Sequence, residues 1–123
     1  KWLATVNEDI NTVREGIKEK NFTKVGETAE FNSLKMHATM ITTKPSIIYW
    51  NPATMEIMHA IQAWREEDLE SYFTMDAGPN VKVMCMAKDA DELKSRLEQL
   101  PGVKQAIICK PGDAAKLVDE HLF

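Results

Sequence analysis

The chain has 123 residues and a net charge of −4 at pH 7, and 44% of its residues are hydrophobic. This length provides for one hydrophobic core, and the acidic balance, without a dense basic cluster, argues against a nucleic-acid-binding surface. Its apolar runs are too short to span a membrane, so we expect a soluble, cytoplasmic domain covering residues 1–123. Cys85 and Cys109 lack metal-ligand spacing, and we expect both to be buried and reduced, with a disulfide as the alternative.

The first fifty residues predict a helical hairpin followed by an extended connector. Apolar residues at steps of three and four predict an amphipathic helix of about five turns. Its stripe consists of Trp2, Leu3, Val6, Ile10, Val13 and Ile17. A second helix is predicted from about Thr23 to Thr39, with Phe22, Val25, Ala29 and Met36 buried. Residues 42–50 have no helical period, and Pro45 disfavours a helix before it, so this connector is predicted to be extended.

The middle of the chain predicts one helix and a β-hairpin. Asn51 and Pro52 are a typical helix start, and this helix ends in the charged run 65–68. Its inner face consists of Ile57, Met58, Ile61 and Trp64. Residues 72–74 and 81–84 have the composition and alternation of strands. Gly78 and Pro79 reverse the chain between them, which places Asp76 in the loop of the hairpin.

The last third predicts a helix, a strand and a second helix. Asp89 and Glu92 resemble a capping box, with Leu93, Leu97 and Leu100 directed inward and Pro101-Gly102 ending the helix. Residues 103–109 are predicted to form a third strand, and Asp113 to cap a helix that runs to about Leu122. Together these elements predict an α+β two-layer sandwich, in which helices cover one face of a small, mainly antiparallel sheet.

Two stretches resemble one enzyme family. Residues 74–83, Thr-Met-Asp-Ala-Gly-Pro-Asn-Val-Lys-Val, resemble the signature of diphosphomevalonate decarboxylases in the bacterial style. Residues 29–39 resemble the family's Glu-x-Asn-x-Leu-x-Met-His-Ala-Thr segment, and residues 45–49 its following Pro-rich piece. The similarity extends from about Val6 to about Cys85 and then fades. The family belongs to the superfamily of galactokinase, homoserine kinase, mevalonate kinase and phosphomevalonate kinase.

The resemblance implies the C-terminal domain of a two-domain enzyme whose active site lies between its domains. The family converts mevalonate 5-diphosphate to isopentenyl diphosphate, with ATP and Mg²⁺ held mainly by the N-terminal domain, and a homodimer is expected. The 5 glycines of this chain form no phosphate-binding cluster before a helix. Because the chain begins at Lys1 inside a helical pattern, we expect the N-terminal domain to be missing. Residues 1–123 alone are then expected to bind no ATP and to be inactive.

The resemblance assigns the catalytic role to Asp76. Its carboxylate would orient the 3-hydroxyl of the substrate and accept its proton during phosphoryl transfer. Ala77 and Gly78 are small enough for the loop to approach the substrate, with loop packing as the alternative, and a glycine is expected where φ is positive or a ligand lies close. Judged from the residues alone, an aspartate before such a turn commonly caps nearby main-chain N–H groups.

Two histidines and two other function classes complete the predictions. We expect a structural role for His37, and no metal site at His59, which lacks ligands at a suitable spacing. A non-catalytic ligand-sensing or dimerising module is the alternative class. Within the superfamily, the alternative is a kinase or decarboxylase of a related mevalonate compound. An exposed apolar strip is expected near the connector 42–50.

Overall fold

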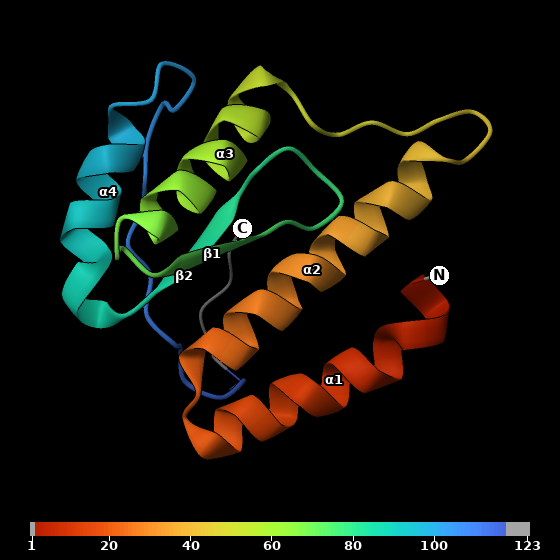
Figure 1. Cartoon of the computed structure of the whole chain (residues 1–123), viewed down its shortest axis with the longest axis horizontal. Helices are drawn as coiled ribbons and strands as arrows, with labels where there is room; N and C mark the ends of the chain where they lie inside the picture. The colour runs from red at the N-terminus through yellow and green to blue at the C-terminus, as the bar shows by residue number, and fades with distance from the viewer. Residues whose placement is uncertain (1, 118–123) are drawn as a thin grey trace.

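The computed structural model describes residues 2–117 and confirms the α+β class (Figure 1). Its elements, in chain order, are α1 (Trp2–Glu19), α2 (Phe22–Ile41), α3 (Pro52–Glu66), β1 (Ser71–Thr74), β2 (Lys82–Cys85), a 3₁₀ turn (Ala87–Asp89) and α4 (Ala90–Glu98). The predicted helical hairpin, the extended connector and the β-hairpin are therefore confirmed. Within residues 2–117, no helix is long and apolar enough to cross a membrane.

Asparagine side chains define the starts of α2 and α3. Asn21 Oδ1 accepts a hydrogen bond from the main-chain N–H of Lys24 at 2.9 Å, and Asn51 Oδ1 accepts one from Thr54 at the same distance. Thr54 Oγ1 in turn accepts from the N–H of Asn51, which completes a capping box ahead of Pro52. These bonds satisfy N–H groups that have no partner within the helix, so each helix starts at a defined residue.

The apolar stripe predicted for α1 is only partly buried. Leu3, Ile10 and Ile17 are exposed, because α1 packs chiefly on α2 and a narrower strip suffices for that contact. The prediction for α2 is also corrected. The four residues expected in its core are half-buried, and its buried residues are instead Gly26, Glu30, Ser33 and His37. This face lies against β1.

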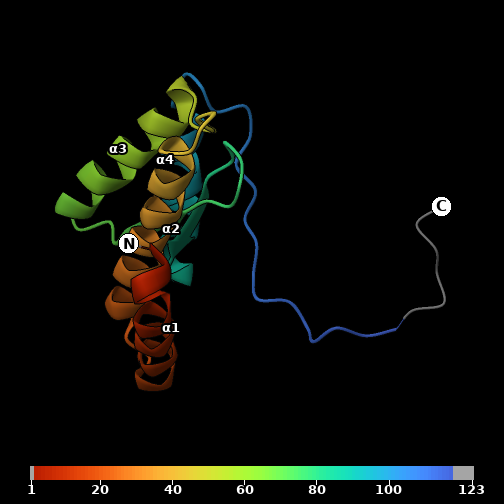
Figure 2. The same cartoon turned by 90° about the vertical axis from the view of Figure 1, so that its right-hand side faces the viewer.

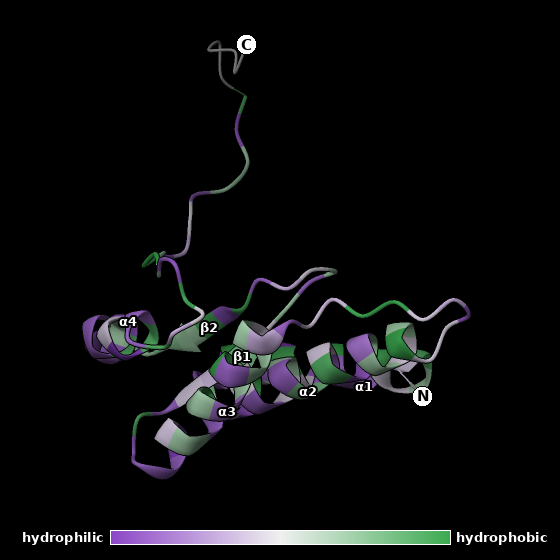
Figure 3. Cartoon of the chain, turned by 90° about the horizontal axis from the view of Figure 1, so that it is seen from above, coloured by the Kyte–Doolittle hydropathy of each residue, from purple (hydrophilic) through white to green (hydrophobic). Residues whose placement is uncertain are grey.

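The sheet has two antiparallel strands, with Tyr72 opposite Met84 and Phe73 opposite Val83. The main core lies between the sheet, α3 and α4. It consists of Met58, Ile61, Leu69, Phe73, Met75 and Leu93. Ile57 and Trp64 of α3 pack against it from half-buried positions. Part of the connector between α2 and α3 is hydrophobic, and Ile47 and Ile48 in it are exposed (Figure 3).

The predictions for the C-terminal third need correction. Residues 103–109 form no strand, because a strand needs a hydrogen-bonded neighbour and none of the described main chain pairs with this segment. This segment instead lines one side of a groove of about 720 Å³, and residues of β2 and α4 line the other side. Residues 113–117 are not helical, and the exposed Leu117 has nothing to pack against; the predicted helix from 118 to 122 lies outside the described residues. Figure 2 shows the end of the described range leading away from the helices.

Two smaller predictions in this region also fail. The Asp89 side chain makes no cap hydrogen bond to α4, because a 3₁₀ turn precedes the helix and places Asp89 itself in a helical conformation. Leu93 is buried as predicted, with Leu97 half-buried beside it. Cys85 and Cys109 are both free thiols, but Cys85 is only half-buried, and Cys109 is exposed because the segment that contains it is not part of a sheet.

Candidate active site

The loop between β1 and β2 presents the Asp76 carboxylate to solvent. The Asp76 side chain is 85% exposed, and Oδ2 accepts a hydrogen bond from Lys82 Nζ at 2.5 Å. An ion pair this exposed contributes only about 0–1 kcal/mol to folding stability. The carboxylate is therefore accessible to a ligand, and a cation lies beside it that offsets its charge.

Main-chain contacts anchor the loop at both ends. Before Asp76, Ser33 Oγ of α2 accepts from the N–H of Met75 at 3.0 Å and lies 3.2 Å from the Met75 carbonyl, to which it donates. After it, Thr54 Oγ1 of α3 donates to the carbonyl of Pro79 at 2.9 Å. Within the loop, the Gly78 N–H donates to the Asp76 carbonyl at 2.8 Å. The exposed carboxylate is thus carried by a main chain that is held from two helices.

The buried ring of His37 lies beneath this loop. It is 1% exposed, and its centroid is 5.4 Å from that of Trp50 and 6.2 Å from that of Tyr49. Burial lowers the pKa of His37, and a hydrogen bond with the Asp76 main chain acts in the opposite direction without reversing the shift. Within residues 2–117, His37 Nε2 and Trp50 Nε1 are buried without a hydrogen-bond partner. The structural role predicted for His37 therefore includes contact with the site.

The three predicted site residues lie together in the loop, and the structure separates the two alternatives expected for Gly78. Gly78 does not have a positive φ, and a Cβ placed on it would meet no atom within 4 Å. The loop therefore does not require glycine for its conformation or its packing, and the open space beside Gly78 is available to a ligand. Ala77 is exposed. His59 is also exposed, and the described residues contain no group of three or more potential metal ligands.

Sequence reasoning missed Lys82, Ser33 and Thr54. The hairpin itself could have identified Lys82, since Thr74 pairs with Lys82 and places its long side chain at the mouth of the loop. Thr54 was detectable as the third helical residue after an asparagine cap, although its bond to Pro79 was not. Ser33 had no local signal, because its partner is 42 residues away in the chain.

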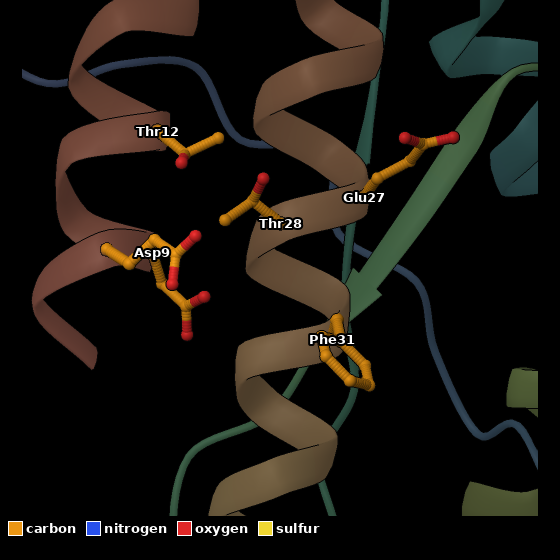
Figure 4. A pocket seen from close by; sticks show the side chains of 6 residues that line it. Asp9, Thr12, Glu27, Thr28 and Phe31 are labelled. Carbon is orange, nitrogen blue, oxygen red and sulfur yellow. The ribbon is translucent and has the colours of Figure 1, made fainter. Parts of the chain in front are cut away.

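A second depression lies between α1 and α2, with a volume of about 350 Å³. Figure 4 shows Asp9 and Thr12 of α1 facing Thr28 of α2, with Glu27 directed away from α1. Asp9 is already engaged by Lys35 Nζ and by Asn32 Nδ2, the latter at 2.7 Å. Its carboxylate therefore serves the contact between the two helices.

Fold and site together define an α+β domain that presents one exposed carboxylate on a hairpin loop anchored at both ends. Residues 1–118 match the family described as the mevalonate 5-diphosphate decarboxylase C-terminal domain, and the chain belongs to this family. The resemblance inferred from residues 29–39 and 74–83 is thereby confirmed.

Relatives of known structure or curated function agree with this assignment. The phosphomevalonate decarboxylase of Haloferax volcanii is 28% identical over 119 residues, which are 96% of this chain and 36% of that protein. A solved structure of the mevalonate diphosphate decarboxylase from Enterococcus faecalis is 39% identical, with a TM-score of 0.79, and the match covers 85% of this chain and 32% of that one. A solved complex of MDDEF with MVAPP, AMPPCP and magnesium is 40% identical, with a TM-score of 0.77, covering 80% and 30%. The chain spans about a third of the length of these relatives.

Proposed function

We propose that this chain is the C-terminal domain of a two-domain, ATP-dependent decarboxylase. The enzyme converts mevalonate 5-diphosphate to isopentenyl diphosphate, carbon dioxide, ADP and phosphate. The observation that carries the proposal is the Asp76 carboxylate, which is accessible on a loop whose main chain is anchored on both sides. The family match and the relatives solved with MVAPP and an ATP analogue support it.

Asp76 acts on the tertiary 3-hydroxyl of the substrate. This alcohol is a weak nucleophile, so a carboxylate within about 3 Å that orients it and accepts its proton assists phosphoryl transfer. A loose transition state depends mainly on positioning and charge, and a weak base is sufficient for late proton removal. Lys82 lies against the same carboxylate and offsets repulsion between Asp76 and the anionic substrate. Ala77 and Gly78 leave space for the substrate to approach the loop.

The residues of this chain do not themselves fit a nucleotide or magnesium site. Asp76 is a single carboxylate paired with a lysine, and no cluster of three metal ligands occurs in residues 2–117. None of the glycines Gly16, Gly26, Gly78, Gly102 and Gly112 lies in a phosphate-binding cluster. We therefore assign ATP and Mg²⁺ to an N-terminal domain. A homodimer and a cytoplasmic location stay predictions.

The test uses the full-length protein with ATP and magnesium, and measures ADP formation and carbon dioxide release. Mevalonate 5-diphosphate and mevalonate 5-phosphate are compared, because the Haloferax volcanii relative is a phosphomevalonate decarboxylase. The diphosphate is expected to be the better substrate. A preference for the monophosphate would show that mevalonate 5-phosphate is the substrate instead. The absence of carbon dioxide release from both compounds would favour a non-catalytic module.

The role of Asp76 is tested by Asp76→Asn in the same assay. The change keeps the size of the side chain but removes the proton acceptor, so kcat is expected to fall at least about 100-fold with little change in KM. Asp91→Asn is the matched control, since Asp91 is an exposed carboxylate on α4. Near-normal turnover of Asp76→Asn would show that Asp76 only stabilises the turn.

A further inference from the structure

The outer edge of β1 has an unusual set of partners. Main-chain groups of alternate residues in a strand point to opposite edges, so those of Ser71, Phe73 and Met75 face away from β2. These residues are almost fully buried. A buried strand edge requires hydrogen-bond partners for its N–H and C=O groups. In the described part of the chain, no other strand lies on this side of β1.

Side chains of α2 take the place of the missing neighbour strand. Glu30 Oε2 accepts from the N–H of Phe73 at 3.0 Å, and Ser33 Oγ accepts from that of Met75 at 3.0 Å. The ring of His37, one turn further along α2, is buried within hydrogen-bonding reach of the Asp76 main chain. We call Glu30, Ser33 and His37 the polar ladder. Its first member is fixed by Arg65, whose Nη2 is 2.6 Å from Glu30 Oε2 and whose Nε donates to the Ser71 carbonyl.

The spacing of the ladder matches the spacing of the strand. Glu30 and His37 are seven residues apart on a helix, which is about 10.5 Å along its axis. Phe73 and Asp76 are three residues apart in extended chain, which is about 10 Å. Glu30 and Ser33 therefore each meet their own main-chain group, and a shift of one residue along the strand would break both contacts, because neighbouring main-chain groups point to the opposite edge. Since the ladder ends at Asp76, it determines how far the strand carries the carboxylate.

We propose that Ser33 and His37 are positioning residues that hold the main chain at Met75 and Asp76, and thereby set the position of the Asp76 carboxylate for the reaction. The catalytic part of this inference rests on the proposed function; the structural part does not. A displacement of about 1 Å at a reacting group costs on the order of 100-fold in rate. Loss of one contact in the ladder is therefore expected to lower kcat and to leave substrate binding largely intact.

The test compares Ser33→Ala and His37→Gln in the full-length protein with two matched controls. Thr28→Ala removes a hydroxyl from the same helix that bonds only to Lys24, and His59→Gln removes an exposed imidazole. Ser33→Ala is expected to speed hydrogen exchange at the Met75 amide at least about tenfold, because that N–H loses its acceptor. Turnover should fall at least about tenfold with KM within about threefold. The controls should change neither quantity.

The variant Leu93→Ala distinguishes the effect of lost stability from the effect of lost positioning, because it removes core volume at a site on α4. It should lower the melting temperature while leaving exchange at Met75 and kcat near wild type. The proposal is overturned if Ser33→Ala and His37→Gln leave hydrogen exchange at the Met75 and Asp76 amides unchanged. It is also overturned if Leu93→Ala lowers kcat as much as these variants do at an equal loss of stability. If Ser33→Ala does not fold, His37→Gln decides. A wild-type enzyme without decarboxylase activity would refute the proposed function, and the exchange data would still decide whether the ladder holds the loop.

Discussion

Replacing Gly26 by alanine tests how closely α2 approaches β1. A Cβ at this position would lie 2.0 Å from Tyr72 Cδ2, 2.4 Å from Cγ and 2.5 Å from Cε2. Carbon atoms in contact are about 3.5–4.0 Å apart, so helix and ring must separate by about 1.5 Å. The ring is 2% exposed, with Phe22 against it at 5.5 Å and the Arg65 guanidinium over it at 4.1 Å. It has no room to move.

Two opposing terms determine the size of the effect. Alanine is about 1 kcal/mol better than glycine inside a helix. Overpacking a closed core costs about 1–3 kcal/mol, and this site lies at the upper end because three ring carbons are involved. We expect a net loss of about 2 kcal/mol, or a fall of roughly 6–12 °C in melting temperature for a domain of this size.

The assay is thermal and urea unfolding followed by circular dichroism. Gly78→Ala is the matched control, because a Cβ there meets no atom within 4 Å, and its stability should change by less than about 0.5 kcal/mol. Pairing Gly26→Ala with Tyr72→Val should recover part of the loss, with a coupling of at least about 1 kcal/mol. If Gly26→Ala equals or exceeds wild type in stability, helix and strand can separate freely, and the packing argument is wrong.

Three further predictions concern ionisable side chains. Glu30→Gln should cost about 2–3 kcal/mol in urea unfolding, since it leaves the Arg65 guanidinium without its carboxylate, whereas the exposed Glu27→Gln should be neutral. The lowered pKa of His37 means that the unfolded state binds its proton more tightly, so the stability that His37 contributes should be complete above pH 6.5 and fall as the pH drops below 6.5. In His37→Gln this dependence of stability on pH below 6.5 should flatten, and an unchanged slope would contradict the assignment. Burial, with a smaller effect from the Asp89 charge, raises the pKa of Cys85, so exposed Cys109 should react with a thiol reagent at least about tenfold faster, and equal rates by mass spectrometry would count against this.

Local patterns were sufficient to predict α1 to α4 and the hairpin, but not the end of the chain, where residues 113–117 are not helical. The period of α1, the cap at Asn51 and the Gly78-Pro79 reversal depend on neighbours within a few residues, and each is found in the structure. The strand expected at 103–109 fails for the opposite reason. Its apolar composition is suitable for a strand, but a strand exists only with a partner, which local sequence does not specify.

In the candidate site, too, features set by local sequence could be predicted and contacts with distant residues could not. Asp76 could be predicted because its motif is contiguous, whereas the contacts that anchor its loop come from residues 25 and 42 positions away. Gly78 was expected to serve either a positive φ or the close approach of a ligand, and the structure excludes the positive φ, because glycine favours that conformation without requiring it. A small residue at the tip of a loop provides either backbone freedom or space for a neighbouring group, and only the structure distinguishes these two roles. At Gly78 the structure is consistent with space for a neighbouring group.

The buried face of α2 shows why hydropathy alone predicted the wrong buried residues for this helix. Gly26, Glu30, Ser33 and His37 recur at helical spacing, and polar residues with this period normally indicate a face in contact with water. Water and an unpaired strand edge, however, make the same demand for hydrogen-bonding side chains. Along β1 and the two residues after it, the four residues lie against Tyr72, Phe73, Met75 and Asp76 in order. Glycine permits the closest approach where the helix crosses a ring, and the three polar residues serve the main chain beyond it. The residues that would lower the hydrophobicity of an ordinary core helix are therefore those that connect this helix to the loop that carries Asp76.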